Sequence, residues 1–233
     1  MNTVFFKYLG VVDFKETWDY QESLLNSTIN IKRANRVSSG SKKKTKNYLL
    51  FCQHPHVYTL GKSGDEKNLL LNKDSLRESG SSFYKINRGG DITYHGPGQL
   101  VVYPIFDLDN FFTDIHKYLR FLEDVVIMVL KKYNIIGSRV KGATGVWVCD
   151  EKGERKICAM GVRASRWVTM HGLAFNFSVD LKRFESIVPC GIKDKSVTSL
   201  DAELGRAIDF EEVLSTFKDC FKEVFQIKIK PLL

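Results

Sequence analysis

Apolar residues recur at helical spacing in the middle of the chain and again near its end. Between 112 and 133 they form one stripe, made of Ile115, Leu119, Leu122, Val126, Val129, Leu130 and Tyr133. Residues three and four positions apart share a helix face, so the stripe predicts a helix packed on a core. A second pattern follows Asp209, a suitable helix cap, and gathers Val213, Leu214, Phe217, Phe221 and Val224. A third helix is expected over 14–34.

Shorter runs rich in β-branched and aromatic residues predict strands. They lie at 5–12, 48–52, 57–60, 83–86, 100–106 and 171–179, and Leu173, Phe175 and Phe177 alternate along the last. Residues 145–148 and 156–162 predict a hairpin that turns around Gly153. Hairpins interleaved with separate helices indicate an α+β fold, with a mixed β-sheet and flanking helices.

Length and composition indicate a folded globular protein. The 233 residues are 43% apolar and 27% charged, enough for one large domain or two small ones. The apolar run at 125–130 is too short to cross a bilayer, so no membrane association is expected. The first residues lack a charged leader and a cleavage site, which favours a cytoplasmic protein.

The net charge of +8 favours an acidic partner without identifying it. Part of the excess lies around one Ser/Gly-rich stretch, in Lys32, Arg33, Arg36, Lys42, Lys43, Lys44 and Lys46. A solvated, flexible loop is the favoured interpretation of that stretch.

The five cysteines include no C-x-x-C pair, so a disulfide framework is not expected. Cys52, Cys149 and Cys158 lie in apolar strand patterns and Cys220 on a helix face, which predicts four small core residues. Cys190 differs, because it stands at a turn in the basic stretch VPCGIKDKS. That setting suits a reactive thiol, although a structural thiol remains open.

A glycine-rich segment, RGGDITYHGPGQ, occupies residues 88–99. Without side chains, its backbone can approach a ligand closely, but an ordinary hairpin loop explains the segment equally well. It matches neither the Rossmann nor the Walker phosphate motif. Cys52, His54 and His56 alternate like metal ligands, yet Pro55 interrupts them and a fourth ligand is missing, so no metal site is expected.

Taken together and in order, these segments resemble the lipoyl(octanoyl) transferase family. The similarity is carried by RGGDITYHGPGQLVVYP, KICAMGVR, HGLAFNFSVDL and FESIVPCGI, and more loosely by HPHVYTLGKSG. It implies one catalytic acyltransferase domain, residues 1–233, with the α+β fold of biotin and lipoate protein ligases. It also implies transfer of an octanoyl group from acyl carrier protein to a lysine of the lipoyl domains of 2-oxoacid dehydrogenases or of the glycine-cleavage H protein.

The resemblance also assigns site residues. Cys190 would be the nucleophile, forming an acyl thioester, and Lys156 its catalytic partner. The acyl pocket would be lined by Arg88, Gly89, Gly90, Asp91, Ile92, Thr93, Tyr94, His95, Ala159, Met160, Gly161, Gly172, Leu173 and Ala174. No cofactor is expected, because the donor thioester is already activated.

The residue types suit this chemistry. A thiolate both attacks and leaves well, and the charge of Lys156 would favour it, whereas a neutral lysine would instead relay protons. The sequence leaves these two roles open. An ATP-dependent ligase of the same fold would not need Cys190, and a nucleic-acid-binding module would carry a binding motif that this chain lacks.

Overall fold

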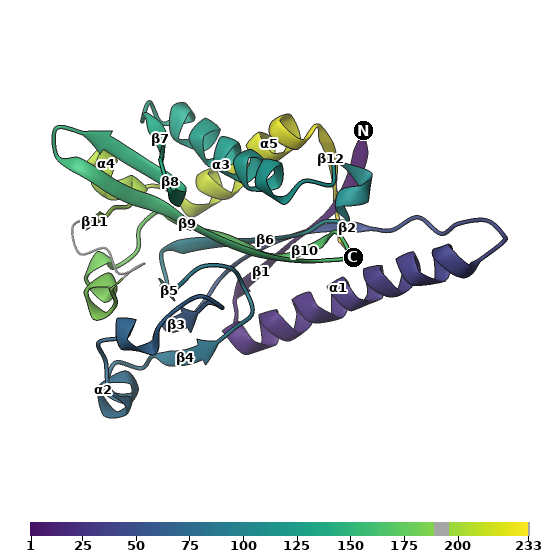
Figure 1. Cartoon of the computed structure of the whole chain (residues 1–233). Helices are drawn as coiled ribbons and strands as arrows, with labels where there is room; N and C mark the ends of the chain where they lie inside the picture. The colour runs from purple at the N-terminus through teal and green to yellow at the C-terminus, as the bar shows by residue number, and fades with distance from the viewer. Residues whose placement is uncertain (189–195, 233) are drawn as a thin grey trace.

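A nine-stranded mixed sheet runs through the middle of the protein (Figure 1). The computed structural model describes residues 1–188 and 196–232. The strands are β1 (Asn2–Val11), β2 (Asn47–Gln53), β6 (Gln99–Ile105), β7 (Gly137–Val140), β8 (Ala143–Asp150), β9 (Gly153–Ser165), β10 (Val168–Asn176), β11 (Ser196–Val197) and β12 (Ile227–Pro231). Their order is β12-β1-β2-β6-β10-β9-β8-β7, and β11 pairs with β9. Strand β1 is parallel to both neighbours and β11 is parallel to β9, while the other pairs are antiparallel.

Helices cover both faces of this sheet (Figure 1). On one face lie α3 (Ile115–Lys132) and α5 (Phe210–Phe225), and on the other lies α1 (Phe14–Val37). The short α4 (Leu200–Leu204) follows β11. Within the described part of the chain, no helix is both long and apolar enough to cross a membrane.

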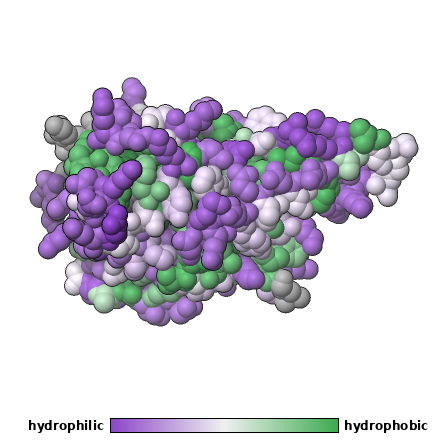
Figure 2. All heavy atoms as spheres, turned by 90° about the horizontal axis from the view of Figure 1, so that it is seen from below, coloured by the Kyte–Doolittle hydropathy of each residue, from purple (hydrophilic) through white to green (hydrophobic). Residues whose placement is uncertain are grey.

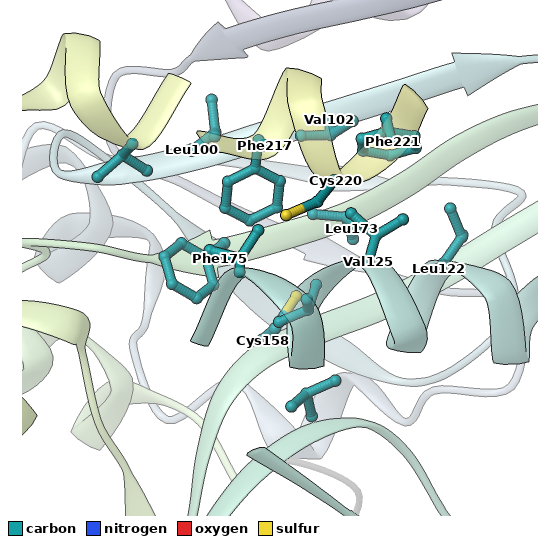
Figure 3. Packing of buried hydrophobic residues seen from close by; sticks show 14 of the residues in the cluster. Leu100, Val102, Leu122, Val125, Cys158, Leu173, Phe175, Phe217, Cys220 and Phe221 are labelled. Carbon is teal, nitrogen blue, oxygen red and sulfur yellow. The ribbon is translucent and has the colours of Figure 1, made fainter. Parts of the chain in front are cut away.

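The largest core lies between the sheet and the α3–α5 pair (Figure 3). Phe175 of β10 meets Phe217 of α5 edge to face, with ring centroids 5.0 Å apart. The sulfur atoms of Cys158 and Cys220 lie among these apolar side chains. Burial raises the pKa of both thiols, that of Cys220 to about 11, so both are protonated and unreactive at neutral pH.

A smaller sheet lies beside the large one. It contains β3 (Val57–Leu60), β4 (Ser82–Lys85) and β5 (Ile92–His95) in the order β4-β3-β5, with α2 (Lys73–Glu78) leading into β4. Short 3₁₀ helices lie at Glu66–Asn68, Leu108–Asn110 and Leu181–Ser186. The last of these helices packs on the small sheet, because Tyr94 meets Phe184 with centroids 5.3 Å apart. The residues just before 189 are therefore held by this sheet.

The expected α+β architecture, with a mixed sheet and flanking helices, is confirmed. Each predicted helix is present with shifted ends, and α1 runs to Val37 rather than to residue 34. Asp209 is the N-cap residue of α5 as predicted, although its side chain makes no capping hydrogen bond. Strands β5, β7, β11 and β12 were not predicted, because each is short and lies at an edge of its sheet or off the main strand order.

One prediction about a single residue was wrong. Cys149 is exposed, because it stands at the end of β8 opposite Glu154, where the hairpin extends beyond the helices. Lys32 lies in α1, as the helix expected over 14–34 predicts. Its side chain is 9% exposed, and its ammonium pairs with Asp107 and, at 2.8 Å, with Asp109, so it does not contribute to a free basic surface.

Candidate active site

A cavity of about 380 Å³ lies where the small sheet meets strands β9 and β10. Its lining includes the start of α1 at Phe14, the glycine-rich loop 88–93, and residues of strands β6, β8, β9, β10 and β11. All the predicted pocket residues except Tyr94 line this cavity, and so does Lys156. The segments that motif order alone grouped together therefore share one cavity.

The glycine-rich loop crosses strand β9 at very short range. The backbone N–H of Gly89 donates to the carbonyl of Val162 at 3.0 Å, and the N–H of Lys62 donates to the carbonyl of Arg88 at 2.9 Å. A Cβ atom on Gly161 would lie 2.6 Å from the carbonyl oxygen of Gly89, closer than packing allows. Glycine is thus required here for steric reasons, and the loop forms a wall of backbone atoms.

Two charged side chains of this loop brace it from within. The buried guanidinium of Arg88 donates to the carbonyl oxygen of Thr59 at 2.8 Å and to its hydroxyl at 3.2 Å. The carboxylate of Asp91 accepts from the backbone N–H of Ile92 at 2.7 Å and from the side-chain amide of Asn68 at 2.6 Å. Both residues thereby fix the shape of the cavity wall to the small sheet.

Tyr94 faces away from the cavity because side chains alternate along β5. Its hydroxyl lies 2.7 Å from Nδ1 of His56, and its ring packs against Tyr58. Neighbouring Thr93 and His95 line the cavity instead. The motif contains consecutive residues of β5, and because consecutive side chains point to opposite faces of the strand, Thr93 and His95 line the cavity while Tyr94 does not.

The inner part of the cavity carries neutral imidazoles. Burial, and next the charge of nearby His54, lowers the pKa of His95 to about 3, and burial lowers that of His171 to about 3. His95 Nδ1 donates to Oε1 of Gln99 at 2.7 Å, since an amide oxygen can only accept. His54 is held by Val12 and Tyr103, and the described residues contain no group of three or more metal-ligating side chains.

A polar network that the sequence interpretation overlooked supports this end of the cavity. His171 Nε2 donates to Oδ1 of Asn87 at 2.9 Å, and the Asn87 amide donates to Glu22 at 3.2 Å. Arg163 pairs with the same Glu22 oxygen at 2.6 Å. His171 and Arg163 stand inside the recognised motifs HGLAFNFSVDL and KICAMGVR, so motif membership was an available signal.

Lys156 stands at the other end, beside Trp147. The two residues are cross-strand partners on β9 and β8, and the Lys156 ammonium nitrogen lies 4.6 Å from the centroid of the Trp147 ring. On its other side Lys156 pairs with Val197 of β11. Ser196 and Val197 also line the cavity.

Cys190 lies outside the described residues, but the described residues Ile187 before it and Ser196 and Val197 after it line the cavity. Before it, the N–H of Val188 donates to the carbonyl of Asn68 at 2.8 Å, and Ile187 lines the cavity. After it, the N–H of Thr198 donates to the carbonyl of Lys156 at 3.0 Å. The last described residues before Cys190 and the first described residues after it therefore lie close to the same cavity.

Comparison with known proteins gives the site its context. Residues 13–222 match the lipoyl protein ligase A/B catalytic domain. This chain belongs to that family. The octanoyltransferase of Christiangramia forsetii is 58% identical over 224 residues, covering 95% of this chain and 95% of that protein. The octanoyltransferase of Flavobacterium psychrophilum is 56% identical over 229 residues, covering 97% of this chain and 98% of its own.

Solved structures of the lipoyl ligase family share the fold at low sequence identity. A putative lipoate protein ligase from T. acidophilum matches with a TM-score of 0.70 at 16% identity, over 100% of this chain and 88% of its own. A lipoate-protein ligase A bound with ATP matches with a TM-score of 0.69, also at 16% identity, and the match covers 99% of this chain and 88% of that protein. The expected ligase-like fold is thus confirmed.

Proposed function

We propose that this chain transfers an octanoyl group from acyl carrier protein to a specific lysine of lipoyl domains, through an acyl thioester on Cys190. The acceptors would be the lipoyl domains of 2-oxoacid dehydrogenases and the glycine-cleavage H protein. Relatives that are octanoyltransferases over nearly the whole length identify the enzyme class as a transferase acting on octanoyl groups. The proposal assigns the chemistry to a single catalytic domain, residues 1–233, working in the cytoplasm, where thiols stay reduced.

The observation that carries the proposal is that the described residues flanking 189–195 lie at one cavity, with Ile187 before the segment and Ser196 and Val197 after it. Val188 is bonded to Asn68, and Val197 pairs with Lys156. Cys190 is only two residues beyond Val188, and two extended residues span at most about 7 Å. The proposal therefore assigns the Cys190 thiol to this cavity.

The reaction then needs two balanced steps. The Cys190 thiolate attacks the thioester carbonyl, its C–S bond forms, and the carrier's thiol leaves with the electron pair of the bond that breaks. The uncharged amine of the acceptor lysine next attacks the acyl-cysteine, the amide bond forms, the amine loses a proton to solvent, and the Cys190 thiolate is released. The donor is already activated, so neither step requires ATP or a cofactor.

The cavity suits an octanoyl chain. Apolar groups from the strands, such as Met160, Val162 and Leu173, form much of its lining, and its inner histidines are uncharged at neutral pH. Burying methylene groups against such a surface is favourable by about 0.8 kcal/mol each. In this proposal the octanoyl chain binds by apolar contact, and its thioester carbonyl lies at the end of the cavity near Lys156.

Intact-protein mass spectrometry tests the proposal. Wild-type protein mixed with octanoyl carrier protein and no ATP should gain the mass of one octanoyl group, and peptide mapping should locate it on Cys190. Adding a lipoyl domain should move that mass to the acceptor. A requirement for ATP and free octanoate, with no adduct on the enzyme, would instead identify a ligase.

A further inference from the structure

The Trp147–Lys156 pair is built by a break in the β8–β9 ladder. Val146 pairs with Cys158, but the next residue, Trp147, pairs with Lys156, so Ile157 is an extra residue in β9. Ile157 is fully buried in the main core, whereas Lys156 and Trp147 both line the cavity. Such a bulge re-aims a side chain, here that of Lys156.

A glycine opposite the bulge makes this geometry possible. Gly145 has φ +113°, a backbone conformation that favours glycine, and a Cβ there would collide with the carbonyl of Cys158. The same Cβ would stand 3.7 Å from Cε of Lys156. The backbone conformations of β8 and β9 thus determine the direction of the Lys156 side chain.

The face of an indole ring discriminates between the two forms of a lysine. The ring's negative face attracts an ammonium within about 6 Å and offers nothing comparable to a neutral amine. At 4.6 Å the Lys156 nitrogen is inside that range, and Trp147 is only 3% exposed. Trp147 therefore favours the charged form of Lys156 and restricts its direction.

We propose that Trp147 is a positioning residue that keeps Lys156 as an ammonium facing the cavity, so that Lys156 activates the nucleophile by charge and not as a base. This inference rests on the proposed function, in which Cys190 is the nucleophile. The thiol proton then goes to solvent, and Lys156 keeps its own proton throughout. Trp147 thus has a role in thiolate formation, although it need not touch the acyl group.

Alkylation of Cys190 by iodoacetamide across pH tests this, in a Cys149→Ser background that removes the exposed competing thiol. Trp147→Leu should slow alkylation near pH 7 about three- to tenfold and move the midpoint of the pH profile upward, whereas Trp147→Phe, which keeps an aromatic face, should retain most of the rate. In a Lys156→Ala background, Trp147→Leu should have no further effect, because the coupling is lost. Equal effects of Trp147→Leu with and without Lys156 would show a merely structural role and overturn the proposal.

A measurement on unmutated protein covers the case in which Trp147→Leu fails to fold. The Lys156 side-chain NMR signal, assigned by its loss in Lys156→Arg, should show the ring-current shift of an aromatic face and no titration below pH 9. Titration near pH 7 would contradict the proposal. Failure of the proposed function looks different, because Cys190 would then carry no octanoyl group even in wild-type protein.

Discussion

Val197 pairs with Lys156 in the parallel ladder between β11 and β9, and the next residue, Thr198, donates its N–H to the Lys156 carbonyl at 3.0 Å. This contact attaches the chain that follows Cys190 to the strand that carries the lysine. Glu203 of α4 strengthens it, since its carboxylate binds both Thr198 and the Arg155 guanidinium next to Lys156. Strand β9 and the segment that begins at Ser196 are thereby joined.

Replacing the proposed nucleophile should abolish transfer. A serine hydroxyl at 190 is far less ionised than a thiol, so Cys190→Ser should lower kcat for octanoyl transfer by at least about 10³-fold. Cys220→Ser is the matched control, because this thiol is buried and its pKa is raised to about 11, and it should keep near-normal activity. Circular dichroism checks folding in both. Near-normal turnover by Cys190→Ser would exclude a covalent intermediate.

Substitutions of Lys156 should separate its two possible roles. Lys156→Ala removes the charge and should slow acylation about tenfold or more, with Cys190 alkylation shifted to higher pH. Lys156→Arg keeps the charge but is a poor base, so it should retain most of the acylation rate. Rapid-quench measurement of the acyl-enzyme gives both rates. An inactive arginine variant would support proton relay, and a fully active alanine variant would exclude both roles.

Recognition of an acidic carrier protein should depend on salt. Long-range attraction by a +8 chain is screened over about 10 Å at 0.1 M salt, so kcat/KM for octanoyl carrier protein should fall as salt is added. Transfer from a small neutral octanoyl thioester should change much less. Equal sensitivity of the two donors would remove the electrostatic explanation.

The basic loop should contribute little to that slope. Helix α1 has 24 residues, so at about 1.5 Å per residue it is about 36 Å long. Phe14 at its first turn lines the cavity, and the loop begins after Val37, in the narrow projection at the right of Figure 2. Changing Lys42, Lys43 and Lys44 to glutamine should therefore leave the salt slope unchanged. A reduced slope would instead locate carrier docking at this distant end.

The close contact at Gly161 predicts a loss of activity from one added methyl group. In Gly161→Ala, the new Cβ would lie 2.6 Å from the Gly89 oxygen and 3.0 Å from Cδ of Arg88, so the loop must shift. Overpacking of this kind costs about 1–3 kcal/mol, and KM for the acyl donor should rise. Gly40→Ala is the control, since its Cβ would meet only Ser38 Oγ, at 3.7 Å. An unchanged KM would show that the loop tolerates displacement.

Buried imidazoles predict acid sensitivity. In the native state, burial lowers the pKa of His54 to about 4 and those of His95 and His171 to about 3, so the unfolded chain binds more protons below about pH 6.5. The free energy of unfolding should therefore fall as pH falls from 6.5 toward 4, by up to about 1.4 kcal/mol per pH unit for each histidine. His171→Gln should flatten this slope in urea titrations, whereas His116→Gln, at an exposed position, should not. A flat profile in wild-type protein would contradict the assigned burial.

The strongest sequence patterns predicted the fold well. The α3 stripe was correct because burial on one face imposes a helical period on Leu122, Val126 and Val129. Short edge strands such as β12 have too few residues for a period to show. Cys149 was misjudged because an apolar run does not reveal where a hairpin extends beyond its covering helices.

Motifs indicated the residues that line the cavity where they mark a close backbone approach, but they did not reveal contacts that depend on strand pairing. The glycines of the 88–91 loop pointed to the cavity directly. The contact between Trp147 and Lys156, by contrast, depends on the extra residue Ile157 in the β8–β9 ladder. No local sequence pattern predicts such a bulge. Tyr94 shows the same limit, since only the pairing of β5 determines which face it occupies.

The parallel pairing of β1 with β12 has a consequence for synthesis on the ribosome. Asn2 lies opposite Ile227, so β1 is made early, and its outer partner emerges only after every other strand described here. Until then one side of β1 presents unpaired backbone groups, which invite association between nascent chains. Lys228, Lys230 and Pro231 suit that position, because charges and a proline discourage a further strand from adding to β12 in the finished protein.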